Sequence, residues 1–206
     1  MNAAAVAASM RVGVFGGAFD PPHRGHGALV EQALRQLALT RLHVVPTGQA
    51  WHKARALTCG AHRLAMCRLA FAEGPAVQID ERELRRSGPS YTVDTLTELR
   101  TLYPDAELIL LMGADQWAAL PSWHRWRDVL ALATPVVAHR PGAPQPAALH
   151  GVAPHLLPWA ALDLSSTAVR AAAAAGAGVA ELARLVPLAV ARYIVDHGLY
   201  RSAGQP

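Results

Sequence analysis

The amino-acid sequence predicts an α/β protein with one parallel, doubly wound sheet that carries helices on both faces. Short apolar segments alternate with longer amphipathic segments along the chain, which is the pattern of repeated strand–helix–strand units. The segment from Leu108 to Met112 is entirely apolar, as expected for a strand that is buried on both faces. With 206 residues, of which 52% are hydrophobic, the chain is long enough to bury one sizeable core.

The expected elements follow one another in this alternating order. A first strand runs from Arg11 to Phe15 and ends at two glycines, and an amphipathic helix follows from about Gly25 to Leu39. The further strands are expected at Leu42 to Pro46, Val77 to Asp80, Leu108 to Met112, Pro135 to Ala138 and near Leu156 to Leu157. The further helices are expected at Ala61 to Phe71, Thr92 to Leu102 and Ser166 to Tyr200, the last one broken at Gly176 to Gly178 and restarted near Pro187. Because strand–helix–strand crossovers are right-handed, these elements predict a Rossmann-like sheet with a helical C-terminal segment.

The chain is expected to form a single domain over residues 11–206, preceded by a disordered leader at residues 1–10. This leader lacks the basic cluster and the long apolar stretch of a signal peptide, and Met10 is an alternative translation start. The Pro- and Gly-rich segment from Arg140 to Pro154 is interpreted as a surface loop, because too little chain follows it to build a second core.

Composition narrows the classes of partner. No apolar run reaches the roughly 18 residues of a membrane span, so we expect a soluble, cytoplasmic protein without a membrane partner. The spacing of Cys59 and Cys67 matches neither a zinc knuckle nor a redox pair, and both are expected to be reduced packing residues. The net charge of +4 is spread along the chain, which fits phosphate-bearing small molecules at least as well as nucleic acid. A homo-oligomer is compatible with this sequence.

The segment GGAFDPPHRGH, from Gly16 to His26, joins the first strand to the first helix. Gly16 and Gly17 allow a sharp turn and a close approach of a ligand to the backbone. His23 and His26 lie three residues apart at the helix start, so both can face one side. Since a helix N-terminus presents unpaired N–H groups and a partial positive charge, two imidazoles there predict a site for phosphate oxygens. A zinc site is the rival interpretation, but no third ligand has a suitable spacing, and no metal site is expected.

A second polar segment opens the helical C-terminal part. Ser165, Ser166 and Thr167 supply three hydroxyls in a row, and Arg170 follows one turn after Ser166 on the same helix face. A plain helix cap is the simpler interpretation of these hydroxyls. The alternative is that hydroxyls, amide groups and the guanidinium converge on one anion.

These segments resemble a known family. The Gly16 to His26 segment is similar to the nucleotide-binding signature of the HxGH nucleotidyltransferase superfamily, and in its full form to that of the bacterial nicotinate-nucleotide adenylyltransferases. The segment LSSTAVR, from Leu164 to Arg170, resembles the SSTxxR motif of the same family. The ending from Leu185 to Tyr200 is also similar, so the resemblance covers nearly the whole chain.

The resemblance implies adenylyl transfer from ATP to nicotinate mononucleotide, a late step of NAD biosynthesis that gives nicotinate adenine dinucleotide and pyrophosphate. ATP is then a substrate, and Mg²⁺ is expected to arrive on its phosphates. Catalytic roles are implied for His26, His23 and Arg170. The implied ATP-binding residues are Gly16, Gly17, Ala18, Phe19, His23, His26, Lys53, Gly113, Asp115, Ser165, Ser166, Thr167 and Arg170. Tyr91 and Thr92 are implied to meet the nicotinate carboxylate through the start of a helix, and Trp123 to stack on the pyridine ring.

The sequence departs from the family pattern at two positions. Ala18 stands where relatives often have Ser or Thr, so a hydroxyl contact is lost there. Ala172 stands where many relatives carry a second arginine, so Arg170 is expected to act without that neighbour.

Three alternative functions remain at this point. An adenylyltransferase could instead take nicotinamide mononucleotide or phosphopantetheine, although the phosphopantetheine enzymes typically have Thr at the position of His23. The non-enzyme alternative is a nucleic-acid-binding module, suggested by the basic pI of about 9.6 and the tryptophans. Since no clustered Lys/Arg stripe and no RNA-binding motif is present, no nucleic-acid partner is expected.

Overall fold

A computed structural model describes residues 10–49, 57–71, 75–140, 142–159 and 162–201. These residues contain a six-stranded sheet in the order β3-β2-β1-β4-β5-β6, in which every neighbouring pair is parallel. The strands are β1 (Arg11–Gly17), β2 (Arg41–Pro46), β3 (Val77–Ile79), β4 (Glu107–Gly113), β5 (Thr134–His139) and β6 (His155–Pro158). The strand order reverses between β1 and β4, which confirms the predicted doubly wound, Rossmann-like fold class.

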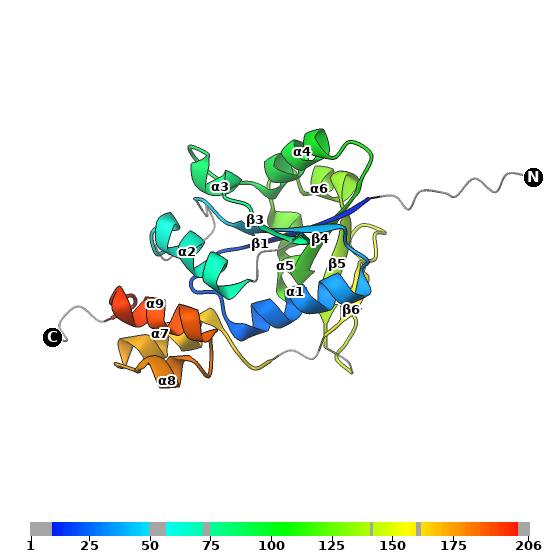
Figure 1. The fold of residues 1–206 in the computed structure, drawn as a ribbon. Coiled ribbons are helices and arrows are strands. Elements are labelled where there is room, and N and C mark those ends of the chain that lie inside the picture. The colour runs from blue at the N-terminus through cyan, green and yellow to red at the C-terminus, as the bar shows by residue number, and fades with distance from the viewer. Residues whose placement is uncertain (1–9, 50–56, 72–74, 141, 160–161, 202–206) are drawn as a thin grey trace, which may run out of the picture.

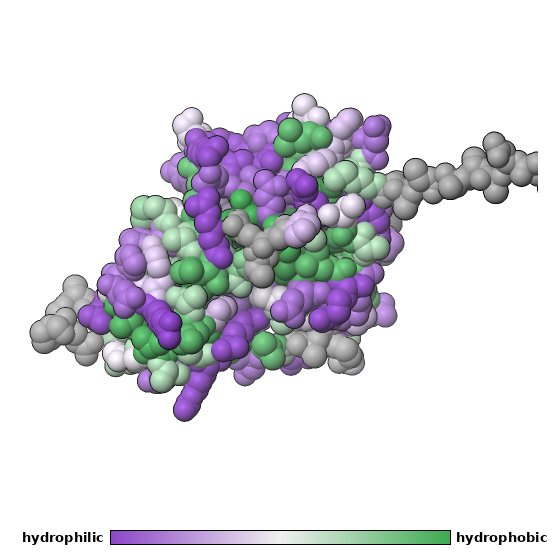
Figure 2. Space-filling view, in the orientation of Figure 1, coloured by the Kyte–Doolittle hydropathy of each residue, from purple (hydrophilic) through white to green (hydrophobic). Residues whose placement is uncertain are grey.

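Helices cover both faces of the sheet (Figure 1). They are α1 (Arg24–Gln36), α2 (Gly60–Ala70), α3 (Arg82–Arg85), α4 (Thr92–Leu102), α5 (Ala114–Ala119), η1 (Leu120–Ser122), α6 (Trp126–Leu132), α7 (Ser166–Ala174), α8 (Val179–Leu182) and α9 (Leu188–Asp196). Helix α1 lies on one face, and α4 and α6 lie together on the other. The outward side of α1 is hydrophilic in the space-filling view (Figure 2), as expected for an amphipathic helix with one face on the core.

The strand side chains alternate between two apolar cores. On β4, Ile109 and Leu111 belong to the core under α1, whereas Leu108, Leu110 and Met112 belong to the core under α4 and α6. This alternation is the period-two pattern of a strand that is buried on both faces. A third apolar cluster joins α7, α8 and α9 to Met66 of α2, and so attaches the C-terminal helices beside α2 (Figure 1).

Some helices end at other residues than the sequence predicts, or were not expected. Helix α1 ends at Gln36 and not at Leu39, because Ala38 adopts a left-handed conformation with φ of 47°. The short helices α3, α5, α6 and α8 were not predicted, because segments of four to seven residues are too short to show a helical period. The C-terminal break does occur at Gly176, where φ is 88°, and α9 begins after Pro187.

No helix among the described residues is long and apolar enough to cross a membrane.

Candidate active site

A cavity of about 500 Å³ opens at the carboxyl edge of the sheet, where the strand order reverses between β1 and β4. Eleven of the sequence-predicted site residues line it: Gly16, Gly17, Ala18, Phe19, His23, His26, Tyr91, Thr92, Gly113, Asp115 and Trp123. They come from the end of β1 and the loop and first turn of α1 that follow it, from the start of α4, from the β4–α5 junction and from the segment after η1. Because some pack on the α1 side of the sheet and others on the α4 side, the cavity spans the edge from one face to the other.

The two glycines at the end of β1 have different roles. The ring of Phe19 lies over Gly17, where an added Cβ would stand 2.9 Å from Phe19 Cζ. Gly16 has no heavy atom within 4 Å of an added Cβ, so its side faces open space. Gly17 is therefore needed for packing, whereas Gly16 leaves room in the cavity.

His23 and His26 stack at the start of α1, with their ring centroids 3.7 Å apart. The backbone N–H of His23 donates to Nδ1 of His26 at 3.1 Å, so the hydrogen of the neutral His26 ring is on Nε2. Phe19 meets the same His26 ring edge-on, with centroids 5.2 Å apart. These contacts fix the direction of the His26 ring.

Burial favours the neutral form of both histidines. Desolvation lowers the pKa of His23 from 6.5 to about 4. Desolvation, followed by repulsion from His23, lowers the pKa of His26 to about 3. At pH 7 these lowered pKa values favour neutral imidazoles, which are N–H donors and not cations.

Gly25, between the two histidines, is required by their arrangement. An added Cβ would stand 3.0 Å from Nδ1 of His23, closer than nearly all real Cβ contacts. The sequence analysis did not explain this glycine, because the constraint is a tertiary contact of the His23 ring.

The Ser165 to Arg170 segment packs against the β1–α1 loop and does not line the cavity. Ser165 Oγ accepts from the N–H of Ala168 at 3.1 Å and is a helix cap. Ser166 Oγ donates to the carbonyl oxygen of Pro21 at 2.8 Å. Arg170 donates from Nη1 to the carbonyl oxygen of Asp20 at 2.8 Å and from Nη2 to Thr167 Oγ1 at 3.1 Å. Of the three hydroxyls, only that of Ser166 bonds to a described residue of the β1–α1 loop, and together with Arg170 it joins segments that are 145 and 150 residues apart in the sequence.

Asp20 is a buried centre of this junction that the sequence analysis missed. Tyr200 Oη donates to Asp20 Oδ1 at 2.8 Å, and the N–H of Thr58 donates to Asp20 Oδ2 at 3.3 Å. Arg63, only 2% exposed, donates from Nη1 to the carbonyl oxygen of Ala18 at 2.9 Å. Burial lowers the pKa of Arg63, and the nearby Asp20 carboxylate opposes that shift. The C-terminal end of the chain therefore fixes the conformation of the loop that carries the histidines.

The start of α4 faces the other end of the cavity. Tyr91 is the residue before the first turn and Thr92 is the first helical residue, and both line the cavity, so the N-terminal end of α4 forms part of its wall. The ring of His124 lies 4.3 Å from that of Tyr91, and Trp123 packs against the same apolar core.

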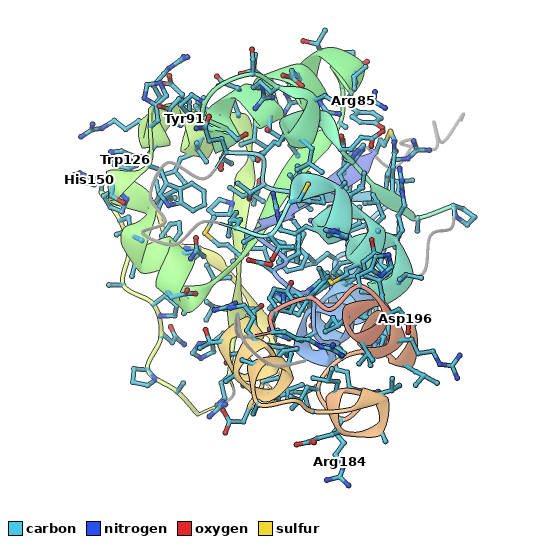
Figure 3. All side chains as sticks on the ribbon, turned by 90° about the vertical axis from the view of Figure 1, so that its left-hand side faces the viewer. Arg85, Tyr91, Trp126, His150, Arg184 and Asp196 are labelled. Carbon is cyan, nitrogen blue, oxygen red and sulfur yellow. The ribbon has the colours of Figure 1, made fainter. Side chains whose placement is uncertain are left out.

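The other described tryptophans divide between packing and the cavity. Trp117 is 1% exposed and belongs to the core under α4. Trp126 lies beside His150 at the outside of the molecule (Figure 3), with ring centroids 4.8 Å apart. Trp159, which the sequence analysis did not single out, lines the cavity after β6.

Gly113 is the last residue of β4, and Asp115 lies in the first turn of α5. An added Cβ at Gly113 would stand 2.6 Å from Asp115 Oδ1, so a side chain at residue 113 would displace this carboxylate. Asp115 Oδ2 accepts from Gln116 Nε2 at 3.1 Å, and the exposed carboxylate borders the cavity. Lys53, the remaining predicted site residue, lies outside the described residues.

The chain is similar to known proteins over nearly its whole length. Residues 14–172 match the model of the cytidylyltransferase-like family. The chain is 52% identical to a probable nicotinate-nucleotide adenylyltransferase of Albidiferax ferrireducens, covering 94% of this chain and 99% of that one. It is 41% identical to the corresponding probable enzyme of Methylibium petroleiphilum, covering 92% of each chain.

Solved structures show the same fold. A Plasmodium falciparum nicotinic acid mononucleotide adenylyltransferase, complexed with NaAD, superposes with a TM-score of 0.77 over 93% of this chain and 97% of that one. The two sequences are only 19% identical, so this likeness concerns the fold alone. By its family model and its relatives, the chain belongs to the cytidylyltransferase-like family and, within it, to the nicotinate-nucleotide adenylyltransferases.

Proposed function

We propose that this chain transfers the adenylyl group of ATP to nicotinate mononucleotide within the cavity at the carboxyl edge of the sheet. A phosphate oxygen of nicotinate mononucleotide attacks the α-phosphorus of ATP. The new P–O bond forms as the bond from the α-phosphorus to the bridging oxygen of the β-phosphate breaks, and pyrophosphate leaves. The observation that carries the proposal is the single cavity that joins the histidine loop to the start of α4 and Trp123.

On the ATP side, the cavity wall supplies mainly oriented N–H hydrogen-bond donors and few charged side chains. The side of Gly16 faces open space, and the Nε2–H group of His26 is held by the contacts of that ring. We assign the phosphates of ATP to these donors, with Asp115 binding ribose hydroxyls beside Gly113. Donors that are already oriented stabilise a developing charge without a cost of reorganisation.

Positive charge is assigned to Arg170 and Lys53. Arg170 has guanidinium donors beyond its two bonds to Asp20 and Thr167, and it lies one turn into α7. The described residues contain no group of three or more His, Cys, Asp or Glu side chains that could hold a metal ion. We therefore assign Mg²⁺ to the phosphates of ATP, where it neutralises charge as the nucleotide binds.

On the pyridine side, the start of α4 favours an acid. The N–H groups of its first turn and the helix dipole attract a carboxylate at Tyr91 and Thr92. A carboxamide brings N–H donors of its own to the same place and loses this attraction. Trp123 offers a flat apolar surface to the pyridine ring.

The decisive assay supplies ATP together with nicotinate mononucleotide, nicotinamide mononucleotide or phosphopantetheine and follows pyrophosphate release. We expect the fastest release with nicotinate mononucleotide. Activity with phosphopantetheine alone would contradict the proposal. Salt-sensitive binding of nucleic acid without any pyrophosphate release would favour the binding-module alternative.

A further inference from the structure

Two buried polar atoms mark the end of the cavity that lies opposite Tyr91 and Trp123. Among the side chains that the structure describes, only Nδ1 of His23 and Nε1 of Trp159 are buried without a hydrogen-bond partner. Both residues line the cavity. A buried N–H group without an acceptor costs about 1–3 kcal/mol, and folded proteins retain few of them. An indole N–H left unpaired in a cavity wall therefore indicates that a ligand supplies the acceptor.

The nitrogen-bearing edge of Trp159 faces the bare backbone of Gly25. A Cβ added at Gly25 would stand 3.9 Å from Cζ2 of Trp159 and 3.0 Å from Nδ1 of His23. Cζ2 and Nε1 are bonded to the same indole carbon, so they lie on the same edge of the ring. A side chain at residue 25 would therefore lie against this edge of the indole ring.

The backbone around Trp159 is held from two sides. The N–H of Trp159 donates to the carbonyl oxygen of His139 at 2.9 Å. The carbonyl oxygen of Pro158 accepts from Gln32 Nε2 of α1 at 3.0 Å. Strand β5 and helix α1 therefore fix where the indole ring enters the cavity.

The surroundings of this N–H group are apolar. Phe15, Leu29 and Ala138 line the cavity and belong to the core under α1, against which Trp159 also packs. A ribose or phosphate placed here would leave several polar groups facing carbon. A flat heteroaromatic ring can instead bury its faces and present one ring nitrogen to the indole N–H, which is only a donor.

We propose that Trp159 recognises the nucleotide base, by donating its indole N–H to a ring nitrogen of the adenine of ATP. This inference rests on the proposed function, which puts the pyridine at the α4 end of the cavity and so leaves the apolar end for the base. Trp159 is a specificity-determining residue for ATP and has no part in binding nicotinate mononucleotide.

The test compares wild type and Trp159→Phe, with ATP and with its 1-deaza, 3-deaza and 7-deaza analogues, each of which replaces one ring nitrogen by carbon. Trp159→Phe keeps an aromatic ring but removes the N–H group. With ATP, kcat/KM should fall about 10-fold, mainly through the KM for ATP, while the KM for nicotinate mononucleotide stays unchanged. With wild type, kcat/KM for the analogue that lacks the accepting nitrogen should be about 10-fold lower than kcat/KM for ATP. With Trp159→Phe, this analogue and ATP should have the same kcat/KM, because the hydrogen bond is already absent.

Trp126→Phe is the matched control, because Trp126 packs against His150 outside the cavity and should leave every ratio between ATP and its analogues unchanged. If Trp159→Phe lowers efficiency equally with ATP and with all three analogues, the proposed hydrogen bond does not exist. Should Trp159→Phe fold poorly, the indole N–H signals of ¹⁵N-labelled wild type provide the same test. One signal should move downfield with ATP and stay in place with one analogue, and the inference is wrong if all four nucleotides move it equally.

A wild type that releases no pyrophosphate from ATP and nicotinate mononucleotide would contradict the proposed function itself. That outcome differs from an active wild type in which Trp159→Phe does not discriminate between the nucleotides, which overturns only the role of Trp159.

Discussion

Arg170 donates from Nη1 to the carbonyl oxygen of Asp20 at 2.8 Å, and this bond ties α7 to the loop after β1. The same loop carries His23 and His26 to the start of α1. A residue expected to bind ATP phosphates thus also positions the loop that carries the histidines. A guanidinium can do both, because it has five N–H donors in a fixed plane.

Arg170→Ala should therefore reduce efficiency with ATP more than with nicotinate mononucleotide. Loss of a charge-assisted hydrogen bond costs about 1.5–3 kcal/mol, which corresponds to roughly a 10- to 100-fold loss in kcat/KM for ATP. Steady-state kinetics with each substrate varied in turn measures the split. Arg184→Ala is the control, because Arg184 is exposed and projects away from the molecule (Figure 3). Equal losses for both substrates would indicate a folding role only.

Gly25→Ala and Gly27→Ala form a matched pair within α1. A Cβ at residue 25 would stand 3.0 Å from Nδ1 of His23, so the His23 ring would have to move. A Cβ at residue 27 would have no heavy atom within 4 Å. We expect Gly25→Ala to lower kcat/KM by about 10-fold or more, because small displacements of a catalytic group are costly. Gly27→Ala should keep its activity and gain about 0.5–1 kcal/mol in unfolding free energy, since alanine favours a helix. Similar activities for the two variants would show that the position of the His23 ring is unimportant.

His26→Asn should lower kcat by about 100-fold or more while leaving the fold intact. The Asn side-chain oxygen can still accept from the N–H of His23, but the Nε2–H donor toward the cavity is lost. His26→Ala, which removes both, should be at least as inactive. Circular dichroism and thermal unfolding check the fold, and near-normal turnover by either variant would remove the catalytic role of His26.

Protein stability should fall as the pH decreases from 6.5 toward 4. The folded-state pKa values of about 4 for His23 and about 3 for His26 lie below the unfolded value of 6.5, so the unfolded state takes up protons first. Each histidine should lower the unfolding free energy by about 2 kcal/mol between pH 7 and pH 5. Urea unfolding at the two pH values measures this loss, which should be smaller by about 2 kcal/mol in His26→Asn. An identical loss in wild type and variant would mean that His26 is not buried in its neutral form.

Nicotinate mononucleotide should be preferred over nicotinamide mononucleotide by roughly 30- to 1000-fold in kcat/KM, corresponding to about 2–4 kcal/mol for a mispaired buried amide. Trp123→Ala should lower efficiency with both substrates and leave their ratio mostly unchanged, because ring stacking does not distinguish acid from amide. If the kcat/KM ratio between acid and amide fell to near one in Trp123→Ala, the selectivity would depend on Trp123 and not on the start of α4.

The sequence by itself determined the fold class and the main contributors to the cavity. The hydrophobic periods of strands and helices are visible within short segments of the sequence. Loops that follow parallel strands lie at the same edge of the sheet, so their positions follow from the fold class. Gly16, Gly17 and Asp115 could therefore be expected at one site, whereas Tyr91, Thr92 and Trp123 were implied by the family resemblance. The cavity brings these residues together.

Only the tertiary structure decided the charge state of the histidines, the contacts of the C-terminal motif and the place of Trp159. The pKa values of His23 and His26 depend on burial, which results from packing and leaves no signal in residue spacing. Ser166 and Arg170 donate hydrogen bonds to backbone carbonyl oxygens of the loop after β1. Every residue type has such an oxygen, so the sequence does not reveal these partners. Trp159 follows a four-residue strand with no motif around it, and it reaches the cavity because β5 and α1 hold its backbone. These contacts join parts of the chain that are distant in sequence, so no local pattern could encode them.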